Sequence, residues 1–409
     1  MIRATRTQWI KFAVVLALYL IFLVWLRSWL GLVVVPFIFD AYITKKIPWT
    51  WWRESKNRHV VTVMGWVDAI VFALVAVYFV NLYFFQNYVI PSSSLEKSLL
   101  TGDYLFVSKM SYGPRVPQTP LHMPLAQHTL PFFNCKSYLE HPQWDYKRVK
   151  GLGDVQLNDI VVFNFPAGDT VATGVPNDDI YRLSYGAGKE LAKPVDLASM
   201  TPEQQRVVYD YYYQLGREYL KENPQNFGEI ISRPVDRREN YVKRCVGLPG
   251  QTLEIKDRII YLDGKANKEP DNVQYRYLVK TKRPIPDDLA HELGISKEDM
   301  MMYYTDASVY NMPLTEKAKA GLLARKDIVV SIENTPADDA GGLYPLNMYK
   351  NWTTDNYGPV WIPKKGETVK LTIENLPVYE RPIHVYEGNE LAVKDGKIYI
   401  NGKETDEYT

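Results

Sequence analysis

The feature that most constrains the fold is an apolar run that extends from Val60 to Phe85. The part from Ala69 to Phe85 carries no charge, and Asp68 is the only charged side chain in the whole run. A helix needs about 20 apolar residues to cross a bilayer. Residues 60–85 therefore predict a transmembrane helix, with Asp68 at a polar interface near its first end.

A second apolar segment lies in residues 1–40, where Arg27 separates two uncharged stretches. Two arrangements fit this pattern. One is a single long tilted span, and the other is a re-entrant hairpin helped by Gly31 and Pro36. A cleaved leader fits poorly, because the apolar stretch is too long and no small-x-small site follows it.

Residues 41–59 form a basic loop with more lysine and arginine than acidic residues. Such loops remain in the cytoplasm, so the run 60–85 is expected to cross outward. Everything from Gln86 onward is then expected to lie outside the cytoplasm.

Residues 86–409 carry the signals of a mainly β domain. The chain has 30 tyrosines and 10 tryptophans, which favour strands. Asp263-Gly264 and Asn401-Gly402 are typical of tight hairpin turns. Short alternating runs with β-branched and aromatic residues predict five strands: Tyr104–Lys109, Asp159–Phe165, Asn240–Val246, Thr252–Leu262 and Thr368–Glu374.

Three stretches interrupt these strands as partly helical insertions. Residues 111–153 are rich in proline and predict a loop. Residues 167–239 contain an amphipathic helix, Thr201–Asn223, that begins with a capping box. Residues 273–362 mix short helices with coil, and their charges predict a solvated elaboration rather than core.

Charge and cysteine content exclude some classes of protein. The net charge of +1 gives no field for binding nucleic acid. Cys135 and Cys245 are too few for a disulfide framework. The two could pair with each other, but two separate buried thiols are expected.

Two segments carry residues for catalysis. Ser92, Ser93 and Ser94 follow the apolar run closely, and Lys243 lies in a predicted strand, where it shares a face with Tyr241 and Cys245. A serine hydroxyl needs a base, and a lysine can serve if burial lowers its pKa. No histidine lies in a recognisable triad motif. On spacing alone, an ordinary strand lysine in a salt bridge remains the alternative for Lys243.

Three segments in order resemble the boxes of bacterial type I signal peptidase. Ile90–Leu95 followed by Gly102-Asp103 is similar to its serine box, Asn158–Phe163 to the next strand box, and Tyr241–Gly250 to its lysine box. The resemblance implies a membrane-anchored, mainly β fold, with transmembrane helices before an antiparallel β-sheet catalytic domain. It implies a serine endopeptidase that removes N-terminal signal peptides from exported preproteins after small-x-small sites.

The resemblance also implies residue roles. Ser94 is the nucleophile, Lys243 is the general base, and Ser92 with the backbone N–H of Ser94 forms the oxyanion hole. The substrate pockets are lined by Ile90, Pro91, Leu95, Leu99, Tyr241 and Val242. No cofactor or metal is implied, and the partners are secreted preproteins and membrane lipid, without nucleic acid. The expected location is the bacterial plasma membrane, with the catalytic domain on its exterior, periplasmic side.

The sequence departs from the family pattern in several places. Leu95 replaces methionine, Lys97 stands where proline is usual, and Asn158 replaces glycine. The final family box, Gly-Asp-Asn-Arg-Asp-x-Ser-x-Asp-Ser-Arg, whose serine orients the lysine, is missing, so the chain is expected to be truncated and its activity reduced. Two alternatives remain: another Ser/Lys peptidase, such as a self-cleaving repressor, and a membrane-anchored peptide-binding β module or inactive homologue.

Overall fold

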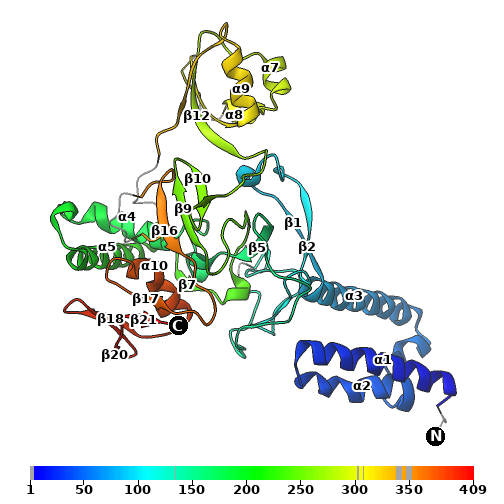
Figure 1. The fold of residues 1–409 in the computed structure, drawn as a ribbon. Coiled ribbons are helices and arrows are strands. Elements are labelled where there is room, and N and C mark those ends of the chain that lie inside the picture. The colour runs from blue at the N-terminus through cyan, green and yellow to red at the C-terminus, as the bar shows by residue number, and fades with distance from the viewer. Residues whose placement is uncertain (1–3, 134, 302–303, 307, 338–342, 347–351) are drawn as a thin grey trace.

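The computed structural model describes residues 4–133, 135–301, 304–306, 308–337, 343–346 and 352–409. Apolar helices from the N-terminal part lie together at one end of the molecule (Figure 1). A β-rich body follows, with a helical pair on one side. A smaller unit that contains α7, α8 and α9 projects at the end opposite the N-terminal helices.

The N-terminal segment is a helical hairpin. α1 (Arg6–Leu26) ends at Arg27, which adopts a left-handed conformation with φ of 51°. The tyrosine hydroxyl of Tyr19 donates to the carbonyl of Gly31 at 2.7 Å, and the rings of Phe12 and Phe39 are 5.4 Å apart. The chain therefore reverses direction after α1. Of the two predicted arrangements, the structure contains the hairpin. The returning arm consists of short helical segments: η1 (Leu30–Val34), α2 (Val35–Phe39) and η2 (Asp40–Thr44).

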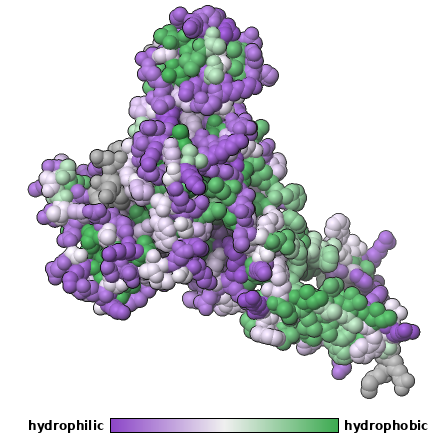
Figure 2. All heavy atoms as spheres, in the orientation of Figure 1, coloured by the Kyte–Doolittle hydropathy of each residue, from purple (hydrophilic) through white to green (hydrophobic). Residues whose placement is uncertain are grey.

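The next long helix, α3 (Arg58–Tyr83), coincides with the predicted run 60–85. α1 and α3 are the two described helices that are long and apolar enough to cross a membrane, by length and composition. They touch where Phe22 lies against Phe79 and Tyr83, with ring centroids 5.1 and 5.2 Å apart. Figure 2 shows hydrophobic side chains covering the surface of this helical end of the molecule.

The body is built from small antiparallel sheets. Two pairs carry the serine and lysine segments: β1 (Phe85–Val89) with β2 (Tyr104–Ser108), and β5 (Ile160–Asn164) with β8 (Asn240–Arg244). A four-stranded sheet has the order β11-β10-β9-β16, with β9 (Thr252–Lys256), β10 (Ile259–Leu262), β11 (Lys265–Ala266) and β16 (Tyr357–Trp361).

Three of the five predicted strands are confirmed as β2, β5 and β8. The predicted strand Thr252–Leu262 is instead the hairpin β9–β10, because Asp257 and Arg258 both adopt positive φ and reverse the chain. The predicted strand Thr368–Glu374 is reduced to β17 (Val369–Lys370), which pairs with β21 (Glu407–Tyr408). The turns Asp263-Gly264 and Asn401-Gly402 are confirmed, with positive φ at all four residues.

The insertion 167–239 contains a helical pair between two short strands. α5 (Pro202–Glu222) confirms the predicted helix, and Thr201 and Gln204 form the expected capping box. The other elements are β6 (Thr170–Ala172), α4 (Ile180–Leu191), α6 (Pro224–Phe227) and β7 (Ile230–Ser232). The insertion 111–153 is mostly loop, as predicted, with the short pair β3 (Arg115–Val116) and β4 (Lys147–Arg148).

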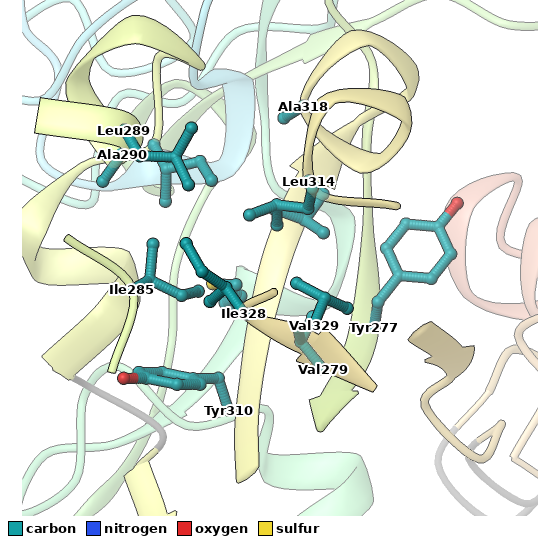
Figure 3. Packing of buried hydrophobic residues seen from close by; sticks show 13 residues of the cluster. Tyr277, Val279, Ile285, Leu289, Ala290, Tyr310, Leu314, Ala318, Ile328 and Val329 are labelled. Carbon is teal, nitrogen blue, oxygen red and sulfur yellow. The ribbon is translucent and has the colours of Figure 1, made fainter. Parts of the chain in front are cut away.

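The insertion 273–362 differs from the prediction of a solvated elaboration. It contains a sheet of order β13-β14-β12-β15, and apolar side chains from this sheet and its helices form a buried cluster (Figure 3). Met312 and Leu322 in this cluster are fully buried. Buried residues alternate with less buried ones along β12 and β14, and the charged residues of β12 lie on its exposed face. The elements are β12 (Gln274–Thr281), α7 (Asp287–Glu292), α8 (Lys297–Met301), β13 (Tyr304–Asp306), β14 (Val309–Thr315), α9 (Glu316–Ala324) and β15 (Val329–Asn334).

The last part of the chain forms a second buried cluster around α10 (Leu376–Arg381) and the sheet β18-β19-β20. The strands are β18 (Leu391–Lys394), β19 (Lys397–Ile400) and β20 (Lys403–Glu404). Both cysteines are free thiols. Cys135 lies in an exposed loop and Cys245 is half-buried, so the expectation of two buried thiols is wrong.

Candidate active site

The serine segment is a tight turn between β1 and β2. Ile90 closes the base of the turn, because its N–H donates to Asp103 O at 3.0 Å and its carbonyl accepts from Gly102 N at 2.9 Å. Its side chain is only 3% exposed and anchors the turn in the body. Ser92 has an extended backbone, and the 3-10 turn η4 (Ser93–Leu95) follows it. This geometry presents Ser94 at the surface of the body.

The lysine segment lies on β8. Lys243 pairs in register with Val161 of β5. Its Nζ donates to Ser94 Oγ at 2.6 Å, although the two residues are 149 positions apart in the chain. Burial lowers the pKa of Lys243, even though the residue as a whole is exposed. No carboxylate pairs with Lys243 among the described residues, so the salt-bridged strand lysine of the sequence-based alternative is not what this structure contains.

A cavity of about 460 Å³ lies beside Ser94 and Lys243. Its other walls come from the serine turn, from β8 and from the segment after β5. The lining residues are Pro91, Ser92, Ser94, Phe165, Ala167, Gly168, Thr170, Val171, Pro176, Asn177, Asp178, Glu239, Asn240, Tyr241, Val242 and Lys243.

The residues expected to bind substrate divide into three groups. Pro91, Tyr241 and Val242 line this cavity together with Ser92 and Ser94. Leu95 lines a different cavity that also adjoins the serine turn. Ile90 and Leu99 line neither cavity, and Ile90 is instead buried under the turn.

One wall of the cavity is absent from the sequence prediction. Phe165 stacks on Tyr241 with ring centroids 4.4 Å apart and an interplanar angle of 6°. Residues 167–178 continue this wall, although they belong to a predicted insertion. The one available signal is the position of Phe165 as the last residue of the predicted strand Asp159–Phe165.

This wall is held from behind by a buried ion pair. Asp169 accepts from Tyr181 OH at 2.6 Å and from Arg381 Nη2 at 2.8 Å. The Arg381 guanidinium lies 3.6 Å from the centroid of the Tyr181 ring. Burial is the main cause that raises the pKa of Tyr181 to about 12, so its hydroxyl remains a donor at neutral pH. The contacts connect the cavity wall to α4 and α10.

Two of the histidines have partners other than Ser94 in the described structure. His128 Nε2 lies 2.9 Å from Glu239 Oε1, and His122 Nε2 lies 3.0 Å from Tyr78 OH. The hydrogen bond to Ser94 Oγ found among the described residues comes from Lys243. The site therefore combines the hydroxyl of Ser94 with the amine of Lys243, and such a pair is suited to acyl transfer.

The sequence model described as "Signal peptidase, peptidase S26" matches residues 63–291, which is more than half of the chain. The chain therefore belongs to the signal peptidase family S26, a family of proteases. Its similarity to proteins named signal peptidase I places it with the bacterial type I members.

Three of these relatives show how the similarity is distributed. Signal peptidase I P of Bacillus subtilis subsp. natto is 20% identical over 279 residues, which cover 68% of this chain and 90% of that protein. Signal peptidase I of Helicobacter pylori is 42% identical over 56 residues, or 14% of this chain and 18% of that protein. The Rickettsia prowazekii protein of the same name is 24% identical over 165 residues, or 37% and 56% of the two chains. No solved structure matches the chain significantly.

Proposed function

We propose that this protein is a membrane-bound serine endopeptidase that removes N-terminal signal peptides from exported preproteins, with Ser94 as nucleophile and Lys243 as general base. The observation that carries the proposal is the 2.6 Å contact between Lys243 Nζ and Ser94 Oγ. A nucleophile and its base must lie within hydrogen-bond reach, and this pair satisfies that condition.

The reaction follows from these two atoms. A neutral Lys243 amine takes the proton of Ser94 Oγ while Oγ attacks the scissile carbonyl carbon. The resulting tetrahedral intermediate collapses when the carbon–nitrogen bond breaks, and the Lys243 ammonium gives its proton to the leaving amine. Water, deprotonated by the same amine, then hydrolyses the acyl-enzyme ester and releases the signal peptide with a free carboxylate.

The oxyanion is proposed to be held by Ser92 and the amide of Ser94. Ser92 and Ser94 line the same cavity, and the Ser94 amide belongs to the first turn of η4, where N–H groups have no intrahelical acceptor. Donors at this position stabilise charge that develops only in the transition state.

The cavity beside Ser94 is proposed to receive the small side chains that precede the cleaved bond. Pro91, Val242 and the stacked pair Tyr241 and Phe165 provide apolar walls. The substrate is expected to bind extended along the exposed part of the serine turn and β8, because an extended peptide can exchange backbone hydrogen bonds with such a segment.

The proposed location is the bacterial plasma membrane. The hairpin that contains α1 and the helix α3 would enter the bilayer, and the basic loop 41–59 between them would remain in the cytoplasm. The body from Gln86 onward would then face exported preproteins at the outer membrane surface.

The proposal is tested by incubating the detergent-solubilised protein with a preprotein and sequencing the N-terminus of the product. We expect a new N-terminus directly after a small-x-small site, and no product with Ser94→Ala. Binding of the preprotein without cleavage would contradict the proposal and favour the peptide-binding module.

A further inference from the structure

A second cavity, of about 340 Å³, adjoins the serine turn. Ser94 is the residue that lines both this cavity and the one beside Lys243. The second cavity is built from the serine turn, from the end of β8 and from the unit around β12 and β14. Its lining residues are Ser93, Ser94, Leu95, Glu96, Ser98, Arg244, Asn272, Val273, Gln274, Arg276, Asp299 and Pro313.

The position of Ser94 between the two cavities determines what each can hold. A peptide whose scissile carbonyl lies on Ser94 Oγ must extend to both sides of the serine. If the cavity with Tyr241 and Val242 takes the residues before the cleaved bond, the second cavity takes the residues after it. An extended chain advances about 3.3 Å per residue, so a cavity of about 340 Å³ can hold the first few residues of the mature protein.

Most charged groups around the second cavity already have partners. Arg244 donates to Asn158 O at 2.9 Å and to Ser98 Oγ at 3.0 Å. Glu96 lies 3.8 Å from the ammonium of Lys97, and Arg276 has interactions of its own. These groups close the walls of the cavity and hold the serine turn against β8.

Asp299 is the exception. Its Oδ2 atom is buried and accepts no hydrogen bond from any described residue. Asp299 belongs to α8, and its N–H donates to Ser296 Oγ at 3.0 Å, which fixes the local backbone. A buried acceptor without a donor is unfavourable, and a donor supplied by a ligand would satisfy it.

We propose that the second cavity is the binding site for the start of the mature protein, and that Asp299 selects a lysine or arginine side chain among its first residues. The proposal rests on the function proposed above and adds a preference on the leaving side of the cleaved bond. A cationic donor is favoured over a neutral one, because hydrogen bonds between charged groups are the stronger ones. A glutamate at the same position of the preprotein would be repelled by the unpaired carboxylate of Asp299.

The test uses three preproteins that differ only at the second residue after the cleavage site, which is lysine, alanine or glutamate. We expect kcat/KM to be highest for lysine and lowest for glutamate, with about a tenfold difference between lysine and alanine. Asp299→Asn should bring the lysine-to-alanine ratio close to one, and Asp299→Glu should restore it. Glu298→Gln, at an exposed neighbour in α8 that does not line the cavity, should leave the ratio unchanged.

The outcomes separate this inference from the proposed function. Equal cleavage of the three preproteins, or an unchanged ratio in Asp299→Asn, would overturn the inference and leave the proposed function standing. Equal loss of cleavage of all three in Asp299→Asn would also overturn it, because the residue would then act without regard to the mature sequence. If the unsubstituted protein cleaves none of the three, the proposed function itself fails.

Discussion

At the scale of single residues, the central feature is the amine of Lys243 held at Ser94. The base must be neutral to accept a proton, and burial lowers the pKa of Lys243 below the usual lysine value of about 10.4. A lowered pKa raises the fraction of neutral amine at a given pH. The rate is therefore expected to rise with pH and to reach half of its plateau below the usual lysine pKa.

This prediction is checked by the pH profile of kcat/KM on a preprotein. Lys243→Arg keeps the charge but cannot lose its proton in the working range, so it should be inactive at every pH. A rising limb centred at or above the usual lysine pKa would contradict a base whose pKa burial has lowered.

Ser92 provides a second prediction at this scale. If its hydroxyl stabilises the oxyanion, Ser92→Ala should lower kcat about 100-fold to 1,000-fold while KM changes little. The reason is that the charge on the oxygen appears only in the transition state. Ser232→Ala, at an exposed serine on β7, is the matched control and should retain full activity. A kcat for Ser92→Ala within a factor of a few of the unsubstituted value would assign the oxyanion to other donors.

Single residues also show how much of the site can be predicted from the sequence. The pairing of Ser94 with Lys243 was an expectation from motif resemblance, and the structure has these atoms in contact. The stacking of Phe165 on Tyr241 and the position of Asp299 could not be predicted. Both depend on which distant segments fold against the site, and the position of Phe165 at the end of a predicted strand does not show what its ring contacts.

At the scale of elements, the pair α4 and α5 supports the cavity wall from behind. Their closest approach is at two glycines. A Cβ at Gly216 would lie 1.7 Å from Ser184 O, and a Cβ at Gly188 would lie 1.7 Å from Tyr212 O. These distances leave no room for a methyl group, so the two helices pack backbone to backbone.

Gly216→Ala should therefore destabilise the protein, by at least the 1–3 kcal/mol or so that is typical of overpacking. Gly186→Ala in the same helix pair is the control, because no heavy atom lies within 4 Å of the added Cβ. Alanine has the higher helix propensity, so the control should be neutral or slightly stabilising. Urea unfolding measures the free energy of unfolding of both variants. Equal values would contradict the prediction, because they would show that the helices can separate without loss of stability.

Elements with strong local signals were the predictable ones. The capping box of α5 and the turns at Asp263-Gly264 and Asn401-Gly402 are as expected. The sequence prediction for the unit around β12 and β14 is wrong, because the exposed Arg276 and Lys280 of β12 obscure the buried alternation of Tyr277 and Val279 in the same strand. Its core becomes evident only when the strands are paired.

At the scale of the whole molecule, the proposed location places the apolar helices in the bilayer and the β-rich body outside it. If the basic loop lies in the cytoplasm, a cysteine at Asn57 should resist labelling by an impermeant reagent added outside intact cells. A cysteine added after Thr409 should react. The exposed thiol of Cys135 must first be replaced by serine, because it would react as well. Labelling at position 57 without labelling at the other end would mean that the orientation is reversed.

The most direct test of the account is preprotein cleavage by four variants in membranes. Ser94→Ala and Lys243→Ala should each abolish cleavage, because one removes the nucleophile and the other its base. The matched controls Ser232→Ala and Lys256→Ala change an exposed serine and an exposed lysine that do not line the cavity, and both should cleave normally. Clear cleavage by either Ser94→Ala or Lys243→Ala would contradict the assignment of these two residues as nucleophile and base.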